Sequence, residues 1–473
     1  MAGRHRHARA SRGRFAWLGA AVLIVLYLGG FTQMPVSSAA FTATTDNSAS
    51  AFTARATFGL TQTAGCFSDN GSGGCPTTAS GIANGAAVVV SPDGKNVYTA
   101  SVSGNAVAAF SRNATTGGLT PLANPNACLS NASSPPPNCS SATGLLSQVW
   151  DLAISPDGKH VYAAAYGSST LVVFARNATT GMLSYQSCLY GNSAVGSCTS
   201  ARGIAGANGV VVSPDGSYVY VTGFNSKALA VFARNTTSGA LTQTAGANGC
   251  FTLTATGTAA TCTVVYGIDQ PYYLRTSPDN RSIYVAGYGS NAIAVLQRNM
   301  TTGVLTQPSA PNGCVYTGTG NANCTGAPGL TGAWHIGISP DGATVYGVGN
   351  TSSSVGSFSR NASTGVLTAI ANPTVRAMTS PTGMAVSPDG LFAFVSASGS
   401  GGVAVFRRDD STGVLTQVTP NASGCIGASA NGCTTGSGLS AAGGIAISPD
   451  GRDVYVVGGA SARGYVAVLN LTH

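Results

Sequence analysis

The chain contains no glutamate. Its 473 residues include 14 acidic side chains, and every one of them is aspartate. Charged residues make up only 8% of the chain, against about 25% in a typical soluble domain. These shortages exclude a mechanism built on a Glu general base, and they argue against long charged helices, because Glu is a common helix-surface residue. The 64 glycines, with abundant Thr, Ser and Val, indicate turn-rich β structure instead.

The N-terminus has the three parts of a secretory signal. Residues 1–14 carry five arginines and no acid, an apolar run covers residues 15–31, and small residues suited to cleavage follow. An uncleaved membrane anchor is the alternative, although the run is slightly short for a span of ~20 residues. We therefore expect a signal peptide over residues 1–40, a linker over 41–57, and a secreted or cell-surface protein that contacts the membrane only if cleavage fails.

Most of the positive charge belongs to that N-terminal segment. Removing the first 40 residues lowers the formal net charge from +8 to +3, because five arginines and no acids are lost. Nucleic-acid binding needs a clustered basic face, and the rest of the chain does not supply one. We expect no nucleic-acid partner.

One unit recurs seven times along the rest of the chain. Each copy has an apolar strand, the turn S-P-D-G (S-P-D-N in the fourth copy), two further strands, a polar R-N-A-T-T-G-type turn and a short G-x-L-T-Q segment. Four short strands in a repeat of this length are typical of a β-propeller blade. We predict an all-β fold with seven four-stranded blades. The motifs begin at Ser91, Ser155, Ser213, Ser277, Ser339, Ser387 and Ser448.

The two ends of the chain complement each other. The seventh copy stops after its third strand, and the missing segment occurs alone as F-G-L-T-Q at residues 58–62. We therefore predict a propeller over residues 58–473 whose last blade is completed by the N-terminal strand. Such a closed ring leaves no large exposed sheet edge.

Repeated Asp and Arg residues should lie at one end of the blades. The Asp of each S-P-D-G and an Arg in six of the third-to-fourth strand turns fall at the same end of a four-stranded meander, so we expect Asp–Arg pairs there. The Asn after most of these arginines matches the N-x-T/S glycosylation signal, but Asn is also a good turn residue, and turn chemistry is the favoured interpretation.

The 12 cysteines form six close pairs in sequence. Each pair lies between the last strand of one unit and the first strand of the next, and the 48-residue interval between Ser339 and Ser387 has none. An even count in an exported chain predicts disulfides, and the 8–12-residue spacings do not fit a zinc site. We expect no metal, and six rigid loops that crown one face. The pairs are Cys66–Cys75, Cys128–Cys139, Cys188–Cys198, Cys250–Cys262, Cys314–Cys324 and Cys425–Cys433.

A candidate site emerges when the units are aligned on S-P-D-G. Four and five residues before the Ser, blades 2, 4 and 5 place large or ionisable residues where the others place mostly small ones. Aromatic walls would come from Trp150, Tyr166, Phe224, Tyr272, Tyr273, Tyr288 and Trp334. Polar contacts would come from Asp151, Asp269, Arg275, His335 and Arg376. The alternative is that the aromatic residues cover the blades and plug the channel.

The order of the motifs S-P-D-G-x-x-V-Y-V, A-V-x-V-F-x-R and T-G-x-L-T resembles the lactonase-type seven-bladed propellers, which include 6-phosphogluconolactonases and muconate lactonizing enzymes. The resemblance covers nearly all of residues 58–473. It implies lactone chemistry at a His shortly before S-P-D-G, and His335 in A-W-H-I-G-I-S-P-D-G lies in about that position. Arg275 and Arg376 would contact an anion. The family also uses a Glu, for which this chain offers only the shorter Asp151 or Asp269.

Two functions fit these observations. The favoured one is a monomeric secreted or cell-surface module, without cofactor, that binds a small molecule, a glycan or a peptide. The alternative is a lactonase-like hydrolase that uses His335 with an Asp and Arg275.

Overall fold

A computed structural model describes most of the chain from Gly59 onwards. The predicted signal peptide and linker lie outside the described residues, so they remain predictions. Within the described part, no helix is long and apolar enough to cross a bilayer. The described ranges are 59–253, 261–319, 321–376, 378–418, 424–428, 433–460 and 463–472.

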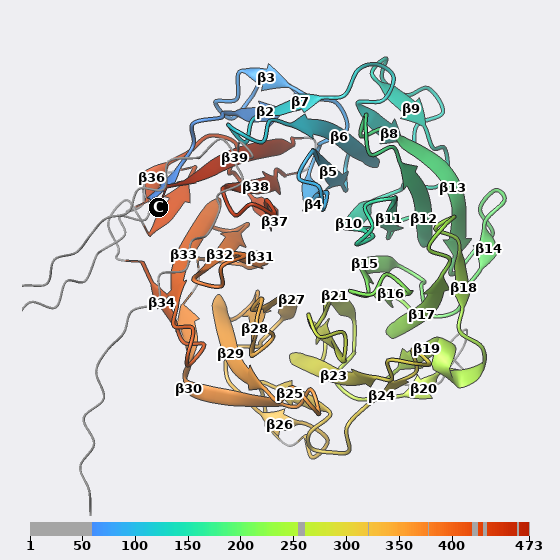
Figure 1. Ribbon diagram of the computed structural model, residues 1–473, viewed down its shortest axis with the longest axis vertical. Helices are drawn as coiled ribbons and strands as arrows, with labels where there is room; N and C mark the ends of the chain where they lie inside the picture. The colour runs from blue at the N-terminus through green and yellow to red at the C-terminus, as the bar shows by residue number, and fades with distance from the viewer. Residues whose placement is uncertain are drawn as a thin grey trace, which may run out of the picture. The chain divides into compact units, whose positions relative to one another are not determined.

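The described residues form seven sheets arranged around a central axis, as predicted (Figure 1). Blade 1 consists of β4 (Gly85–Val90), β5 (Asn96–Ser101), β6 (Ala106–Arg112), β7 (Leu119–Pro121), β8 (Cys128–Ser130) and β9 (Cys139–Ser141). Blade 2 consists of β10 (Val149–Ile154), β11 (His160–Ala165), β12 (Thr170–Arg176), β13 (Leu183–Tyr190) and β14 (Thr199–Ser200). Blade 3 consists of β15 (Ala207–Val212), β16 (Tyr218–Gly223), β17 (Ala228–Arg234), β18 (Leu241–Gln243), the short 3-10 helix η1 (Gly246–Gly249), β19 (Cys250–Thr252) and β20 (Thr263–Val264).

Blades 4 to 7 repeat this plan. Blade 4 consists of β21 (Pro271–Thr276), β22 (Ser282–Gly287), β23 (Ala292–Arg298), β24 (Leu305–Thr306), β25 (Cys314–Tyr316) and β26 (Thr325–Gly326). Blade 5 consists of β27 (Ala333–Ile338), β28 (Thr344–Gly349), β29 (Ser354–Arg360) and β30 (Leu367–Arg376). Blade 6 consists of β31 (Pro381–Val386), β32 (Phe392–Ala397), β33 (Gly402–Arg408), β34 (Leu415–Gln417), β35 (Cys425–Gly427) and β36 (Thr434–Thr435). Blade 7 consists of β37 (Ala442–Ile447), β38 (Asp453–Gly458) and β39 (Tyr465–Thr472), together with β1 (Gly59–Thr61), β2 (Cys66–Ser68) and β3 (Thr77–Thr78).

The N-terminal strands complete the last blade, as predicted. Strand β1 pairs antiparallel with β39, with Leu60 opposite Leu471, and β2 pairs with the first part of the same strand. The closure therefore uses more of the N-terminus than the G-x-L-T-Q segment. Gln62 of that segment also exchanges two hydrogen bonds with the backbone of Ser437, which lies between blades 6 and 7.

The core lies between adjacent blades. The second strand of each sheet is almost entirely buried on both faces, because each sheet packs against a neighbour on either side. Seven main clusters of buried apolar residues result, one for each junction. The predicted closed ring therefore has no single core, and its stability depends on seven similar interfaces.

Six of those junctions carry the same polar contact. An Arg at the end of the third strand is buried and pairs with the S-P-D-G Asp of the preceding blade at 2.7–2.9 Å. In Arg176, for example, Nη2 bonds Asp93 and Nε bonds the Tyr98 hydroxyl, which itself donates to the Gly181 carbonyl. The sequence predicted the pairs, and the structure shows that they join neighbouring blades.

At the junction between blades 6 and 7, apolar residues replace both the Arg and the Tyr of the repeated contact. Leu471 occupies the Arg position, since its N–H bonds Arg452 O as that of Arg408 bonds Leu391 O. The hydroxyl-bearing tyrosine of the other junctions is replaced here by Phe394. Both residues belong to one apolar cluster with Phe392. Loss of the Arg thus accompanies loss of the hydroxyl that would bond it.

All six predicted disulfides are present, but they do not crown the mouth of the channel. Each joins the fourth strand to the start of a short parallel fifth strand, which forms the outer edge of the sheet (Figure 1). The expectation of a crown was wrong because the chain adds this extra edge strand before it crosses to the next blade. Blade 5 lacks both the disulfide and the fifth strand within the described residues.

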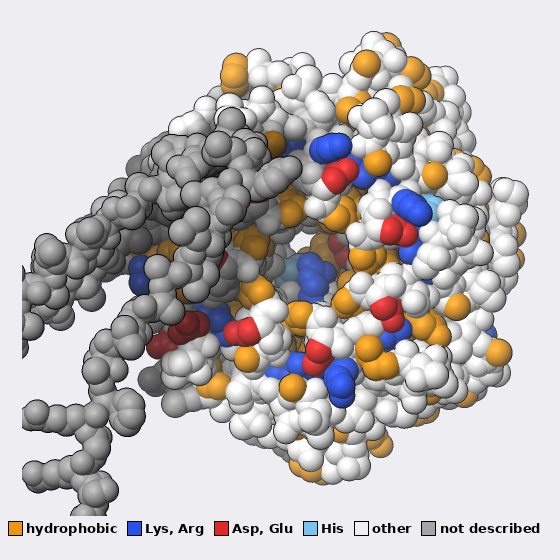
Figure 2. Space-filling view, viewed as in Figure 1, with side chains coloured by type: hydrophobic (Ala, Val, Ile, Leu, Met, Phe, Trp, Pro, Cys, Tyr) orange, Lys and Arg blue, Asp and Glu red, His pale blue; other side chains and the backbone are white. Residues whose placement is uncertain are grey.

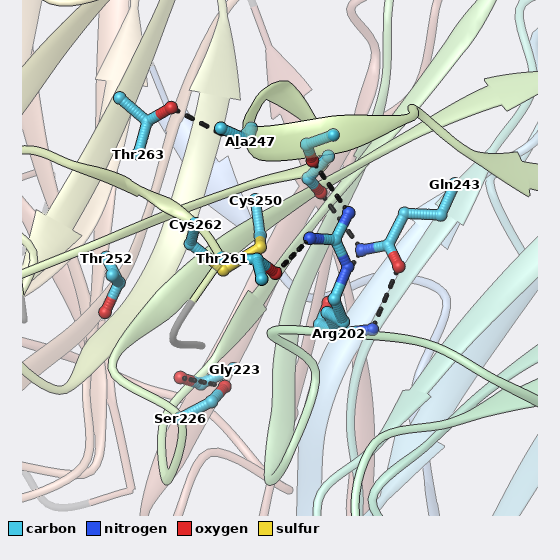
Figure 3. The surroundings of a disulfide bond; sticks show 12 residues. Arg202, Gly223, Ser226, Gln243, Ala247, Cys250, Thr252, Thr261, Cys262 and Thr263 are labelled. Carbon is cyan, nitrogen blue, oxygen red and sulfur yellow. Dashed lines mark hydrogen bonds between the residues drawn. A yellow bond between two sulfur atoms is a disulfide. The ribbon is translucent and has the colours of Figure 1, made fainter. Parts of the chain in front are cut away.

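Side chains from the repeat hold these outer loops in place. Figure 3 shows Arg202 beside the Cys250–Cys262 disulfide, where its guanidinium donates to Thr261 Oγ1 and to the Gly246 carbonyl. Gln243, from the G-x-L-T-Q segment, bonds the Arg202 backbone and Gly249 O. Arg202 is therefore a structural residue of the outer edge.

The Asn that follows five of the six repeated arginines behaves as a turn residue. In Asn113, the side-chain oxygen accepts the N–H groups of Thr115 and Thr116, and four other blades repeat the arrangement. This geometry is the turn chemistry that the sequence favoured.

Candidate functional site in the central channel

The innermost strand of every blade is bulged at the same place. In each one the pairing with the second strand slips four or five residues before the S-P-D-G Ser. The bulged residues include Ala86, Trp150, Asn208, Tyr272, Trp334, Thr382 and Gly443. A bulge re-aims side chains, and such distortions are common next to binding sites. The positions singled out in the sequence are thus those where the backbone departs from regular pairing.

The aromatic residues of blades 2 to 5 pack against one another. Tyr272 is at the centre, stacked on Trp334 with ring centroids 3.9 Å apart. Trp150, Phe224 and Tyr288 surround it at 5.2–6.1 Å. Tyr166 lies at the edge, against Phe224, and its hydroxyl donates to Asn225. These residues therefore form one packed aromatic cluster, which both the wall and the plug interpretation require.

Two adjoining cavities remain open beside the aromatic cluster. The first, called the upper cavity, is about 320 Å³ and is bordered by Trp150, Trp334 and the small residues of blades 6, 7 and 1. The second, called the lower cavity, is about 200 Å³ and is lined by Asp151, Arg275 and His335 with apolar residues of blades 1 to 3. Ala86, Tyr273 and Thr382 border both. Figure 2 shows the central opening from one face, with basic and histidine side chains on its wall.

Arg275 and His335 meet in the lower cavity. The guanidinium Nη2 is 2.9 Å from His335 Nε2, so it donates to that nitrogen when the imidazole is neutral. Burial and the nearby positive charge of Arg275 hold the pKa of His335 well below its usual range, while the Ile336 backbone opposes them. The other ring nitrogen, Nδ1, is buried and has no hydrogen-bond partner among the described residues. His335 therefore presents a neutral imidazole with one unused polar atom.

Asp151 is the acidic group of this cavity. Its carboxylate accepts the N–H groups of Val210 and Leu152, each at 2.9 Å. Burial raises its pKa to about 6, although Arg275 and the two backbone bonds act in the opposite direction. Burial and the positive charge of Arg275 thus act in opposite directions on the pKa of Asp151, and displaced pKa values occur both at functional sites and in structural ion-pair networks.

Tyr273 separates the aromatic layer from the charged one. It is buried, its ring centroid is 4.8 Å from that of His335, and its hydroxyl donates to the Trp150 carbonyl at 3.3 Å. Burial raises the pKa of the phenol far above its usual value, so the ring remains neutral. The structure therefore gathers all three predicted catalytic residues and Tyr273 around one cavity.

The other two predicted polar residues belong to different parts of the fold. Asp269 pairs with Lys227 at 2.9 Å on the surface between blades 3 and 4, and it is not among the residues that border the two cavities. Arg376 belongs to β30, the outermost strand of blade 5, where its backbone pairs with Ser354. Its side chain lies outside the described part of the chain, so its predicted contact with an anion stays a prediction.

The structure adds residues that the sequence reading passed over. Asn208 occupies the bulge of blade 3 and is 1% exposed, and its Oδ1 has no hydrogen-bond partner in the described chain. Thr382 and Asn350 border the upper cavity. Asn208 and Thr382 share the alignment position of Trp150 and Trp334, so that position could have identified them. They were not selected because their side chains are smaller than those of the aromatic residues.

The comparisons with known proteins agree with this architecture. The family described as "Lactonase, 7-bladed beta-propeller" matches residues 46–195, 129–250 and 316–428, which together exceed half of the chain. The chain belongs to this family of seven-bladed lactonase propellers. Curated proteins gave no match.

Solved structures of related propellers resemble the fold. A candidate 6-phosphogluconolactonase of Bacteroides fragilis superposes with a TM-score of 0.54 at 20% identity, over 71% of this chain and 83% of its own. The periplasmic gluconolactonase of Pseudomonas aeruginosa gives a TM-score of 0.52 at 18% identity, over 71% and 84%. At these identities the likeness establishes the shared fold.

Proposed function

We propose that this protein is a secreted or cell-surface propeller that binds a small anionic ligand of carbohydrate type in its central channel. The observation that carries the proposal is the Arg275–His335 pair. Two residues before the S-P-D-G Ser, where blade 4 has Arg275, the other blades have Val, Ala or Gly. One cationic side chain in a cavity, at a position where the other blades place small residues, is a suitable anchor for a carboxylate or phosphate.

The surrounding groups support ligand binding. A buried polar atom without a partner is costly in a protein, and His335 Nδ1 is such an atom. A ligand oxygen that accepted its N–H would remove that cost. The six disulfides and the periplasmic location stated for the Pseudomonas relative support an extracytoplasmic setting.

Binding is favoured over catalysis because the lone pair on His335 Nε2 already accepts from Arg275. A histidine in that arrangement has no free lone pair with which to act as a base. As long as that bond persists, His335 serves as a hydrogen-bond donor.

Lactone hydrolysis is the second candidate, and the state of Asp151 favours it. A carboxylate whose pKa is about 6 is available as a general base near neutral pH. It would take a proton from the water that attacks the lactone carbonyl, and Arg275 would stabilise the oxyanion. The ring C–O bond then breaks and the ring oxygen takes up a proton, giving the open hydroxy acid. Asp151 would replace the Glu of the family.

Tryptophan fluorescence offers a direct test of binding. Of the three tryptophans, Trp17 lies in the predicted signal, so Trp150 and Trp334 at the mouth report alone in the mature protein. We expect glucuronate to bind and glucose to bind more weakly. Arg275→Gln should lower glucuronate affinity about tenfold or more, as expected for loss of a charge-assisted bond. The exposed Arg452→Gln is the matched control.

Two outcomes would decide against this function. Equal affinity for glucose and glucuronate, or unchanged affinity in Arg275→Gln, would contradict an anion site at Arg275. Turnover of a γ- and δ-lactone panel that is lost in Asp151→Asn and retained in the exposed Arg452→Gln would establish the hydrolase instead.

A further inference from the structure

The two cavities of the channel differ in charge. The lower cavity contains Asp151, Arg275 and His335. The described residues that border the upper cavity carry no full charge, and they offer aromatic rings, amides and hydroxyls instead. A ligand that occupied both would therefore need one charged end and one neutral, polar end.

We propose that the upper cavity holds a second, uncharged sugar ring, so that the ligand is an acidic disaccharide or the acidic end of a longer saccharide. The inference rests on the proposed function, because it places the acidic sugar against Arg275. It goes further by assigning the neighbouring ring to the upper cavity, which Trp150 and Trp334 border.

The sizes of the cavities suit one ring each. Pockets for drug-sized ligands are ~300–1,000 Å³. The lower cavity, at about 200 Å³, falls below that range, and the upper one, at about 320 Å³, lies at its lower end. Because Ala86, Tyr273 and Thr382 border both, an extended ligand can pass from one to the other.

The lining of the upper cavity matches the two faces of a sugar. A pyranose has flat C–H faces that pack on aromatic rings, and both tryptophans are half-buried there. Its hydroxyls need donors and acceptors at the edges. Asn350 donates to the Pro381 carbonyl at 3.0 Å and Thr382 to that of Ala442 at 2.8 Å, which fixes both side chains and leaves their oxygens as acceptors.

Ala86 is one of the three residues that border both cavities. It occupies in blade 1 the bulge position that Trp150 and Trp334 occupy in blades 2 and 5. The same backbone geometry accepts a large aromatic residue in those blades. Ala86→Phe should therefore fold, and it should place a large ring where the two cavities adjoin.

The test compares three probes by isothermal titration calorimetry. They are glucuronate, a set of disaccharides in which glucuronate or galacturonate is linked to glucose, and cellobiose. With the wild-type protein we expect the best acidic disaccharide to bind about tenfold more tightly than glucuronate, and cellobiose to bind more weakly than either. Trp334→Ala should remove the disaccharide advantage with glucuronate affinity within about twofold of wild type, because Trp334 does not border the lower cavity. Ala86→Phe should also remove the disaccharide advantage. Because Ala86 borders both cavities, the readout for this variant is the ratio of the two affinities.

The controls separate this inference from the proposed function. Tyr185→Ala removes an exposed aromatic ring from β13 on the outer part of blade 2, and should leave all three affinities unchanged. Equal affinity of the wild-type protein for glucuronate and every acidic disaccharide would overturn the second subsite and leave the anion site intact. An advantage that survives in both Trp334→Ala and Ala86→Phe would also overturn it. Failure of every acidic probe to bind would overturn both proposals.

Discussion

Two sets of residues form rings around the channel axis. One set is the same in almost every blade, and the other differs from blade to blade. At the S-P-D-G end, six of the seven blade junctions repeat one Arg–Asp contact. At the inner-strand bulges, by contrast, the occupants range from Gly443 through Asn208 to Trp334. The Arg–Asp contact of this repeated ring recurs because every blade must be attached to the next one. The bulge ring has no contact that repeats in this way, although Asp151 and Thr382 each bond the following blade, and its variety makes the channel asymmetric.

The junction between blades 6 and 7 shows that the repeated contact can be replaced, but only as a set. Leu471 and Phe394 stand where Arg and Tyr stand elsewhere, and both are buried in one cluster. An apolar seam can therefore hold two blades together when none of its members needs a hydrogen bond. Replacing a single member at another junction would leave buried polar groups without partners.

Removal of the N-terminal strands would break the repeated architecture most severely. A chain that begins at residue 58 keeps β1, β2 and β3, and should unfold at the wild-type temperature. A chain that begins after Thr78 exposes the outer edge of β39 and loses the bonds from Gln62 to Ser437. We expect it to unfold or aggregate, as measured by thermal unfolding and size-exclusion chromatography. Equal melting temperatures for the two chains would refute the closure.

The next largest effect is expected from a substitution of Arg112, which forms ion pairs with Asp450 and with the buried Asp453. Arg112→Leu leaves these carboxylates without their cation, and should lower the free energy of unfolding by about 3–5 kcal/mol in urea titrations. The triple variant Arg112→Leu, Asp453→Phe, Tyr455→Phe copies the composition of the apolar junction and should recover part of the loss. If Arg112→Leu cost less than about 1 kcal/mol, the contact would contribute no more than an exposed ion pair.

The repeated ring was predictable from the sequence and the bulge ring only in part, for a physical reason. A motif that recurs at fixed spacing must serve the same local geometry each time, so S-P-D-G, the Arg and the Cys pairs predicted the blades, the Asp–Arg pairs and the disulfides, but not that the Asp–Arg pairs join neighbouring blades. The contact between Arg275 and His335 depends on how two blades lie across a bulge, which no single unit encodes. The outer placement of the disulfides was missed because a two-residue edge strand has almost no sequence signal.

One aspartate from each ring can be replaced to compare how the two residues make the free energy of unfolding depend on pH. Burial raises the pKa of Asp151 to about 6, from a usual value of 3.8. The folded protein then holds this proton more tightly than the unfolded chain. The contribution of Asp151 to stability is therefore greatest below about pH 4 and is lost as the pH rises through 6, by up to about 3 kcal/mol. Asp151→Asn should gain stability relative to wild type between pH 4 and pH 8.

Asp93, in the repeated ring, should respond with the opposite sign. Burial would raise its pKa, but bonds from Ser91, Arg176 and the Lys95 backbone outweigh burial and hold the pKa below its usual value. Its contribution is present at neutral pH and is lost as the pH falls through the acid range. Relative to wild type, Asp93→Asn should therefore be most destabilised at neutral pH and less so near pH 3. Urea unfolding of both variants across this pH range measures how the free energy of unfolding of each variant, relative to wild type, changes with pH. Changes of the same sign in both variants would contradict the opposite pKa shifts of Asp151 and Asp93.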